Sequence, residues 1–243
     1  MAESSYKYTG KLYLIPTTLG DSNPIEVLPY SIRKLIERID HYIVENEKTA
    51  RKSIKLVVPK KKQQSLHLSP LNKFTPGESL PGFLDPCKEG LDVGLLSEAG
   101  CPGIADPGAE IVKLAHKMGI RVVPLVGPSS ILLAMMGSGM NGQSFTFHGY
   151  LPIDKKERKQ EVKNLERISA ERNQAQIFIE TPYRNNNLLE DLVQSLHPST
   201  NLCVACDLTL STEYIMTKAA GEWARTKVDL NKRPTIFIIQ KEL

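Results

Sequence analysis

The sequence lacks most features that mark secreted, membrane or nucleotide-phosphate-binding proteins. It has no run of about 18 apolar residues, and its amino terminus, MAESSYKYTG, has no apolar signal segment. Four cysteines in 243 residues are too few for a disulfide scaffold. Neither G-x-G-x-x-G nor G-x-x-x-x-G-K-[ST] occurs, which argues against the usual dinucleotide and P-loop sites. We therefore expect a cytoplasmic protein without a membrane span.

Aromatic residues and net charge are also modest. Aromatic residues make up 6% of the chain, and 31 basic against 27 acidic residues give a net charge of +4. Nucleic-acid-binding modules usually have a stronger positive excess. This mild excess permits an anionic partner without requiring one. With 41% hydrophobic and 24% charged residues, the composition is that of a globular protein of one large or two modest domains.

Cys203 and Cys206 form a C-x-x-C pair that must be weighed as a metal or redox motif. The pair lies in Leu202–Leu208, which has the pattern of a strand, so positions three apart face opposite sides of a sheet. No second C-x-x-C is present to complete a zinc site. We expect buried apolar thiols and no metal site.

The most informative stretch is the loop between an apolar strand, Val93–Leu96, and an amphipathic helix. The helix is expected to begin near Asp106 or Pro107, which suit a cap and a first helical position. Between them, Gly100 and Gly103 allow the backbone to approach a ligand closely at the carboxyl end of a strand. An ordinary βα turn is the alternative, but the loop is longer than such a turn needs.

Turn-forming residues follow other predicted strands as well. The strand Lys11–Ile15 runs into the loop Pro16–Asp21. The strand Ile120–Val126 leads to Ser129 and Ser130 at the start of a helix, where their hydroxyls either cap the helix or hold a carboxylate. The sequence thus predicts several ligand-type loops in its first half.

A charged segment, Glu45–Lys52, follows the predicted strand Tyr42–Val44. A solvated helix start is one interpretation, and a site at a strand end is the other. Lys60–Lys62 is basic enough to contact phosphates, although lysines in a connecting loop are more often simply solvated.

The pattern of elements predicts an α/β protein with two α/β domains. The first half alternates strands and helices, which indicates parallel βαβ units. A half-buried strand, Phe145–Tyr150, precedes Pro152, and we place the domain boundary here, giving domains 1–147 and 148–243. Strands predominate in the second half, which favours a mixed sheet.

Several segments together resemble the tetrapyrrole-methylase-fold methyltransferases, closest to the branch that 2′-O-methylates a cytidine of small-subunit ribosomal RNA (rRNA). The resemblance covers nearly the whole chain. It is carried, in order, by LYLIPTTLGD, LLSEAGCPGIADPG, VPLVGPSS, FTFHGYLP, IFIETPYR and VACDLTLSTE.

This resemblance implies two α/β domains with S-adenosylmethionine (SAM) bound in the cleft between them, typically in a homodimer. It implies rRNA, or the small ribosomal subunit, as the partner. The positions that match the SAM site are Pro16, Ser97, Glu98, Ala99, Gly100, Gly103, Ile104, Ala105, Ser129 and Ser130 in the first domain, and Glu180, Thr181, Ala205, Pro234 and Thr235 in the second.

Methyl transfer to a hydroxyl requires alignment of the acceptor with the donor, exclusion of water, and a base. Candidate bases at strand ends are Glu45, Glu47, His67 and Glu180, of which Glu45 is our first choice as the catalytic residue. The candidate substrate-binding residues are Lys48, Arg51 and Arg184.

The chain departs from the branch's pattern in the segment that follows Glu45. Lys48 stands where the branch has an arginine, and a lysine cannot make the same bidentate phosphate contact. Two alternatives therefore stay open. One is a methyltransferase acting on a small molecule such as a tetrapyrrole, and the other is a SAM-binding regulatory protein without catalysis.

Overall fold

A computed structural model describes residues 6–242 of the chain. The chain divides into two compact units, residues 1–129 and 130–243.

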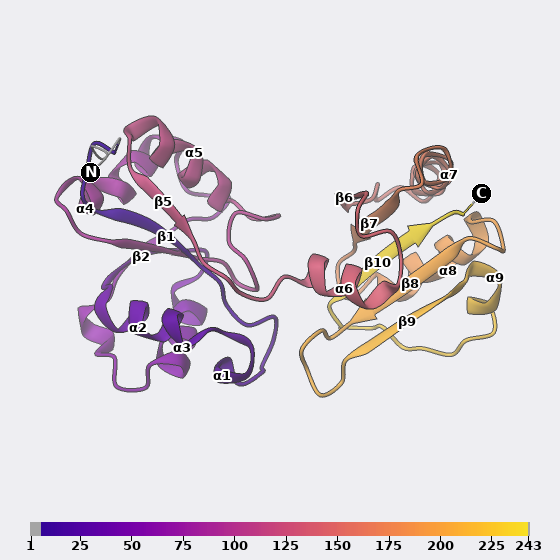
Figure 1. Ribbon diagram of the computed structural model, residues 1–243, viewed down its shortest axis with the longest axis horizontal. Coiled ribbons are helices and arrows are strands. Elements are labelled where there is room, and N and C mark those ends of the chain that lie inside the picture. The colour runs from indigo at the N-terminus through magenta and orange to yellow at the C-terminus, as the bar shows by residue number, and fades with distance from the viewer. Residues whose placement is uncertain (1–5, 243) are drawn as a thin grey trace. The chain divides into compact units, whose positions relative to one another are not determined.

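The first unit is built on an all-parallel five-stranded sheet in the order β3-β2-β4-β1-β5 (Figure 1). Its strands are β1 (Lys11–Ile15), β2 (His41–Val44), β3 (His67–Pro70), β4 (Val93–Leu96) and β5 (Arg121–Pro124). The predictions for β1 and β4 are confirmed at both ends. Strand β3 was not predicted, because its sequence HLSP is short, polar and ends in Pro70; an edge strand tolerates such a proline.

Helices cover both faces of this sheet (Figure 1). The helices are α1 (Pro24–Val27), α2 (Tyr30–Arg38), α3 (Glu47–Val57), α4 (Asp85–Lys88) and α5 (Gly108–Met118), with 3₁₀ segments at Gln63–Ser65 and Gly77–Leu84. One core cluster joins Ile36 of α2 and Ile54 of α3 to Ile15. Another joins Ile111 of α5 and Cys87 of α4 to Leu95. The unit is therefore a doubly wound domain, and its parallel α/β character confirms the prediction.

The second unit contains a mixed five-stranded sheet in the order β6-β7-β10-β8-β9. The strands are β6 (Phe145–Tyr150), β7 (Ala175–Ile179), β8 (Asn201–Cys206), β9 (Tyr214–Ala219) and β10 (Thr235–Gln240). Only β6 and β7 pair in parallel, and the other three pairs are antiparallel. This confirms the predicted mixed sheet.

Helices α6 (Ser130–Ser138), α7 (Lys155–Arg172), α8 (Asn185–Ser195) and α9 (Ala220–Trp223) belong to the second unit. Helices α7, α8 and α9 pack on one face of the sheet through Leu165, Leu192 and Trp223 (Figure 1). Helix α6 contacts β8, β9 and β10, and Gly137 of α6 lies against Ile215.

The division between the units falls earlier in the chain than the expected boundary between residues 147 and 148. That boundary would cut β6, which is hydrogen-bonded to β7, and would separate α6 from the sheet that it contacts. The turn signal at Pro152 ends a strand and does not end a domain. Among residues 6–242, no helix combines the length and the apolar character that crossing a membrane requires.

Candidate active site

The carboxyl ends of β1, β2 and β4 lie side by side because these strands are parallel and in register. Ile15 and Val44, the last residues of β1 and β2, both pair with Leu96, the last residue of β4. The loops that follow them therefore meet at one edge of the sheet. This edge is where open α/β sheets bind ligands.

The loops after β1 and β4 are joined by hydrogen bonds. The backbone N–H of Thr17 donates to the carbonyl of Gly100 at 3.0 Å, and the Thr17 hydroxyl donates to the carbonyl of Ser97 at 3.3 Å. Ser97 Oγ donates to the Gly100 carbonyl at 3.2 Å. Gly100 has φ of 76°, the left-handed region that favours glycine. Pro16, Thr17, Ser97 and Gly100 thus form one rigid, largely buried unit.

Asp106 shapes the rest of the β4 loop. Its carboxylate accepts hydrogen bonds from the N–H groups of Gly103, at 2.9 Å, and Gly108, at 2.7 Å. Burial raises the pKa of Asp106, and these two bonds oppose that shift. Helix α5 begins at Gly108, slightly later than expected, with Pro107 as its N-cap residue, and the N–H of Gly108 donates back to Asp106. Ile104 and Ala105 lie exposed on the loop.

Glu45 lies at this edge, directly after β2. Its Oε1 accepts a hydrogen bond from the backbone N–H of Glu98 at 3.0 Å, and Glu98 Oε1 accepts one from the Thr49 hydroxyl at 2.6 Å. Glu45 lines a small pocket together with Thr17, Thr49, Ser97 and Glu98. The segment Glu45–Lys52 is therefore both the start of helix α3 and part of the strand-end site, so its two interpretations are compatible.

The surroundings of Glu45 raise the pKa of its carboxyl group. Burial is the main cause, and the nearby carboxyl groups of Asp106 and Glu98 add to it, while the hydrogen bond from the Glu98 N–H acts in the opposite direction. A carboxylate that is partly desolvated beside other carboxylates is a stronger proton acceptor than an exposed one. The geometry therefore suits Glu45 to proton transfer.

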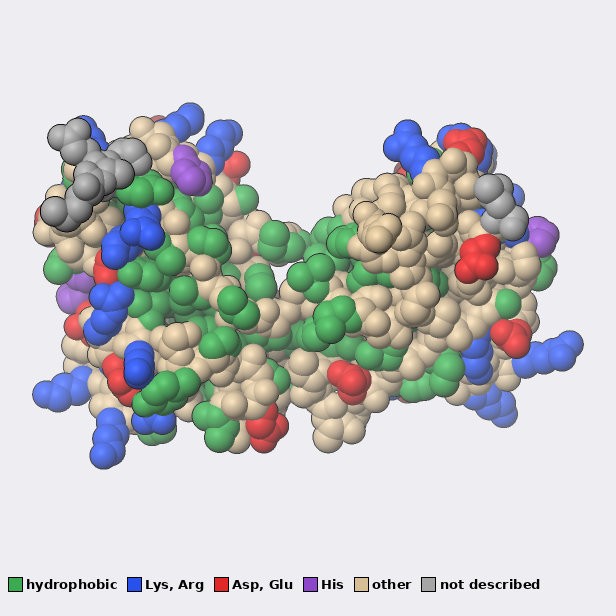
Figure 2. All heavy atoms as spheres, in the orientation of Figure 1, with side chains coloured by type: hydrophobic (Ala, Val, Ile, Leu, Met, Phe, Trp, Pro, Cys, Tyr) green, Lys and Arg blue, Asp and Glu red, His purple; other side chains and the backbone are tan. Residues whose placement is uncertain are grey.

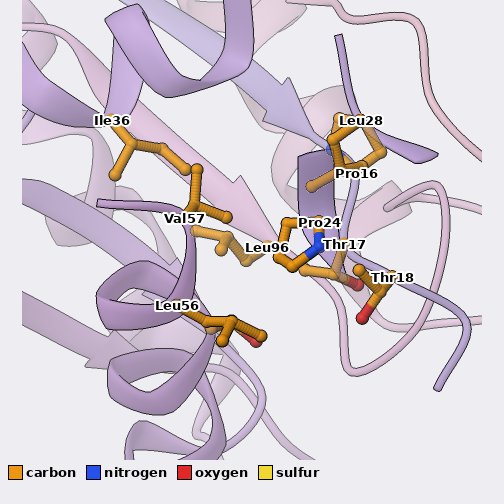
Figure 3. A pocket seen from close by; sticks show the side chains of 10 residues that line it. Pro16, Thr17, Thr18, Pro24, Leu28, Ile36, Leu56, Val57 and Leu96 are labelled. Atoms are coloured by element: carbon orange, nitrogen blue, oxygen red, sulfur yellow. The ribbon is translucent and has the colours of Figure 1, made fainter. Parts of the chain in front are cut away.

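An apolar pocket adjoins the Glu45 pocket and shares Thr17, Ser53 and Leu96 with it. In Figure 3, side chains from the β1 loop, from α1 and from α3 surround this pocket. Its lining includes Pro16, Thr18, Pro24, Leu28, Leu56 and Val57. This edge of the sheet thus has a polar pocket at Glu45 and an apolar pocket lined in part by α1.

The turn after β5 packs closely on the turn after β1. A Cβ atom added to Gly127 would lie 2.2 Å from Cγ of Pro16, so only glycine fits there. The thiol of Cys101 donates a hydrogen bond to the carbonyl of Pro128 at 3.4 Å. Ser129 ends the first unit, and Ser130 is the first residue of α6.

In the second unit, the five predicted residues gather at one edge of the sheet. Strand β10 runs antiparallel to β7 and β8, so its first residue, Thr235, lies beside the carboxyl ends of both neighbours. Thr235 pairs with Cys206, and Ile236 pairs with Ala205 and with Ile179. Glu180, Thr181 and Pro234 are the adjoining residues. The sequence-based grouping of these residues agrees with this geometry.

Glu180 is already engaged within the protein. Its Oε1 accepts hydrogen bonds from the Thr181 N–H and from Nη2 of Arg184, both at 2.6 Å. Its side chain is only 3% exposed. Glu180 is therefore positioned to hold the loop after β7, and Arg184 is its partner.

A second charged network at this edge was missed by the sequence analysis. Arg233 Nε donates to Oδ2 of Asp207 at 2.7 Å, and the Thr212 hydroxyl donates to the same oxygen at 2.9 Å. Arg233 Nη2 also donates to the Thr212 carbonyl at 2.6 Å. In the sequence, Asp207 follows β8 and Arg233 precedes β10. Only the antiparallel pairing of these two strands brings the two side chains together.

The remaining candidate bases lie elsewhere. His67 begins β3 at the amino edge of the first sheet, where its ring stacks on His41 with centroids 4.7 Å apart. It is therefore at the opposite end from Glu45. Glu47 is exposed in the first turn of α3.

The candidate substrate-binding residues of the first unit differ in their contacts. Lys48 is exposed in the first turn of α3. Arg51 donates from Nη1 to the carbonyl of Gln63 at 2.6 Å. Part of the Arg51 guanidinium is thus committed to the loop that follows α3.

The C-x-x-C cysteines lie in strand β8. Cys203 and Cys206 are buried free thiols, as expected, and Cys206 belongs to the core cluster under α7 and α8. Within residues 6–242, no group of three or more His, Cys, Asp and Glu side chains is arranged to hold a metal ion.

Comparison with known proteins identifies the family. Residues 11–224 match the family model of the tetrapyrrole (corrin/porphyrin) methylases. The chain is 31% identical over 219 residues to a protein of Halalkalibacterium halodurans named ribosomal RNA small subunit methyltransferase I, covering 89% of this chain and 71% of that protein.

Solved structures show the same fold. The methyltransferase CobJ matches with a TM-score of 0.63 and 14% identity, covering 96% of this chain and 94% of CobJ. Uroporphyrin-III C-methyltransferase from Thermus thermophilus, complexed with S-adenosyl homocysteine, matches with a TM-score of 0.57 and 17% identity, covering 96% and 98% of the two chains. The match of residues 11–224 to the family model, together with the 31% identity to the Halalkalibacterium protein, shows that this chain belongs to the tetrapyrrole (corrin/porphyrin) methylase family and is a methyltransferase.

Proposed function

We propose that the chain transfers a methyl group from SAM to the ribose 2′-hydroxyl of a cytidine in small-subunit rRNA. The observation that carries this proposal is the 31% identity, over 89% of the chain, to a relative named as a small-subunit rRNA methyltransferase. Glu45 is positioned to act as a base. Methyl transfer to a hydroxyl needs a base, whereas a protein that only binds SAM does not need one.

The residues proposed to hold SAM form two groups, one in each unit. Pro16, the loop Ser97–Ala105 and the pair Ser129–Ser130 supply mainly backbone groups in the first unit. Glu180, Thr181, Ala205, Pro234 and Thr235 form the edge in the second. We propose that both groups contribute to binding SAM.

The residues present fit such a ligand. The loop after β4 is shaped by Gly100 and Gly103 without any phosphate-binding motif, as a sulfonium ligand lacking phosphates requires. Among the residues that the structure describes, Asn185 Oδ1 and Thr209 Oγ1 are buried acceptors without a hydrogen-bond partner. They follow β7 and β8 at the same edge, where amine or hydroxyl groups of a nucleoside would satisfy them.

SAM supplies an electrophilic methyl group on a sulfonium sulfur. In-line transfer of this group to the acceptor hydroxyl would require the protein chiefly to align the two partners. The hydroxyl proton passes to the carboxylate of Glu45, which Glu98 N–H holds in place.

Lys48, Arg51 and Arg184 are proposed to contact the acceptor. Lys48 presents an exposed ammonium group next to Glu45 in the chain. Arg51 and Arg184 each use one nitrogen within the protein, so they would contact the acceptor through their remaining donors. We further propose that the protein acts as a homodimer in the cytoplasm, where its ribosomal acceptor lies.

Incubation of the purified protein with methyl-labelled SAM tests this proposal. Unmodified small ribosomal subunits, total RNA and a small-molecule extract are offered separately. We expect label on the ribose of a small-subunit rRNA cytidine. Label only in the small-molecule extract would replace RNA by a small acceptor, and SAM binding without label in any fraction would make the chain a binding protein.

A further inference from the structure

The positive charge of the chain is concentrated in one segment. Residues 33–62 hold ten of the 31 Lys and Arg residues but only four of the 27 Asp and Glu residues, a net charge of +6. The rest of the chain holds 21 basic and 23 acidic residues, a net charge of −2. The modest total of +4 therefore conceals one strongly basic region.

Helix α3 places much of this charge on one face. Lys48, Lys52 and Lys55 follow the i, i+4, i+7 spacing and are all exposed. Ala50 and Ile54, on the opposite face, are buried against the sheet. The three lysines thus form a stripe about 10 Å long on the outer side of the helix.

The loop after α3 extends the stripe. Lys61 is anchored, since its Nζ donates to the carbonyls of Ile39 and Glu37 and lies 2.8 Å from Oδ1 of Asp40, leaving its side chain 8% exposed. Its neighbours Lys60 and Lys62 remain exposed. Arg51 fixes this loop to α3 through the carbonyl of Gln63. We call Lys48, Lys52, Lys55, Lys60 and Lys62 the α3 basic stripe.

The stripe begins at the candidate active site. Helix α3 starts directly after Glu45 at the carboxyl edge of the sheet and returns the chain to the amino edge, where β3 begins parallel to β2. In Figure 2, Lys and Arg side chains project from the surface over α2 and α3, at the lower left. A polyanion bound along the stripe would therefore lead toward Glu45.

This arrangement is costly for the helix itself. Lys48 and Lys52, Arg51 and Lys55, and Lys52 and Lys55 are like-charged neighbours at i,i+3 or i,i+4 spacing, each pair destabilising by about 0.2–0.5 kcal/mol. Glu47 is the one acidic residue in α3. The acidic partner Asp21 lies 3.2 Å from Lys52, but both side chains are exposed, and such pairs contribute little.

Helix α7 is also basic and provides a contrast. It contains four glutamates, and its Arg167 pairs with Glu171. Lys155, Arg158 and Lys159 converge on the buried carboxylate of Asp191. Four of the seven Lys and Arg residues of α7 therefore lie within ion-pair distance of an acidic side chain, whereas in the α3 basic stripe Lys52 alone does so among the described residues.

We propose that the α3 basic stripe binds the phosphate backbone of the RNA acceptor and guides the target ribose to Glu45. This inference rests on the proposed function, because it takes RNA as the acceptor. Phosphate contacts of this kind position the RNA without reading its sequence.

The test compares two double variants in the otherwise intact protein. K52Q/K55Q removes two charges from the stripe, and K113Q/K117Q removes two exposed lysines at i,i+4 spacing from α5 as the matched control. Binding to protein-free small-subunit rRNA and to an unrelated RNA of equal length is measured across a range of salt concentrations. Thermal unfolding and SAM binding are measured for each variant.

We expect K52Q/K55Q to weaken binding to both RNAs about tenfold and to reduce the salt slope by about one to two. The control should match the wild type. The inference is overturned if the K52Q/K55Q slope equals that of the control, or if anionic phospholipid vesicles bind the stripe in preference to RNA. If RNA binding depends on the stripe but no methyl group is transferred to small subunits, the result would support RNA binding by the α3 basic stripe and contradict the proposed function.

Discussion

The backbone N–H of Glu98 donates a hydrogen bond to the carboxylate of Glu45 at 3.0 Å, joining the loop after β4 to the start of α3. These two residues are far apart in the sequence and come from loops with different expected roles. Glu98 belongs to the loop proposed to hold SAM, and Glu45 is the proposed base. The bond therefore connects the proposed donor side of the site to the proposed acceptor side.

Substitution of Glu45 by Gln should abolish turnover with little effect on SAM binding. Gln retains an oxygen that accepts the bond from Glu98 but cannot take up the acceptor's proton, so we expect a loss of at least about 100-fold in kcat. Methyl transfer and equilibrium SAM binding are measured side by side. Normal turnover in E45Q would remove Glu45 from the mechanism.

The same substitution should stabilise the protein at neutral pH. Burial raises the pKa of Glu45 in the folded state, so the folded state favours the protonated form. Stability from this group is present below its unfolded pKa and is lost as the pH rises through the folded pKa. E45Q should therefore unfold at a higher temperature than wild type at pH 7, and the difference should disappear in acid. If E45Q and wild type had the same Tm at pH 7 as well as in acid, this account would be contradicted.

Thiol labelling reports on the loop after β4. Cys87, Cys203 and Cys206 have no exposed surface, and burial raises the pKa of Cys206 to about 11 and that of Cys87 to about 12. Cys101 is partly exposed, so it should be the first thiol to react with iodoacetamide at pH 8. Saturating SAM should slow this reaction at least about tenfold, because Cys101 lies within the loop proposed to hold SAM.

The C101S variant is the control for this experiment. It should lose the fast phase, and unfolded wild type should react at all of its thiols. A fast phase that persists in C101S, or one that SAM does not change, would contradict the assignment.

Gly127→Ala should destabilise the first unit by about 1–3 kcal/mol. The added Cβ would lie 2.2 Å from Cγ and 2.3 Å from Cβ of Pro16, whose ring cannot rotate away. Gly142→Ala is the matched control, since its added Cβ meets nothing within 4 Å, and its effect should stay within about 0.5 kcal/mol. Urea unfolding measures both, and equal stabilities for the two variants would show that the β1 and β5 turns are not in firm contact.

Arg184→Met should destabilise the second unit by about 1–3 kcal/mol. The change leaves the Glu180 carboxylate, 3% exposed, with only the Thr181 N–H as its partner. Adding Glu180→Gln to this variant should recover most of the loss, because the uncompensated buried charge is then gone. Additive effects of the two substitutions in urea unfolding would mean that the pair is not coupled.

The sequence predicted those parts of the fold whose signals are local. Strands β1 and β4 have continuous apolar runs bounded by turn residues, and both ends of each are as expected. Strand β3 has no such run, since its position at the sheet edge relaxes the demand for apolar and N–H-bearing residues. The division before α6 was also not visible, because it depends on which sheet the helix contacts.

In the candidate site, too, the features with local sequence signals were predicted and those that depend on long-range pairing were not. Loops that directly follow strands, such as the one at Ser97, were identified because the end of an apolar run marks them. The contact of Asp207 with Arg233 was not, because it depends on the pairing of β8 with β10. Likewise, His67 is the first residue of β3 and not the last. It therefore lies at the amino edge of the sheet, opposite the edge that holds Glu45.

The position of β10 also sets the order in which the second unit can be assembled during synthesis. This strand lies between β7 and β8, yet it is made after every other strand of its sheet. Until residues 235–240 have left the ribosome, β7 and β8 have no common neighbour and the core that Phe237 completes is open. The nascent second unit therefore cannot complete its sheet until this central strand is made, and its strand edges stay exposed until then. The edge proposed to hold SAM forms only in the same late step.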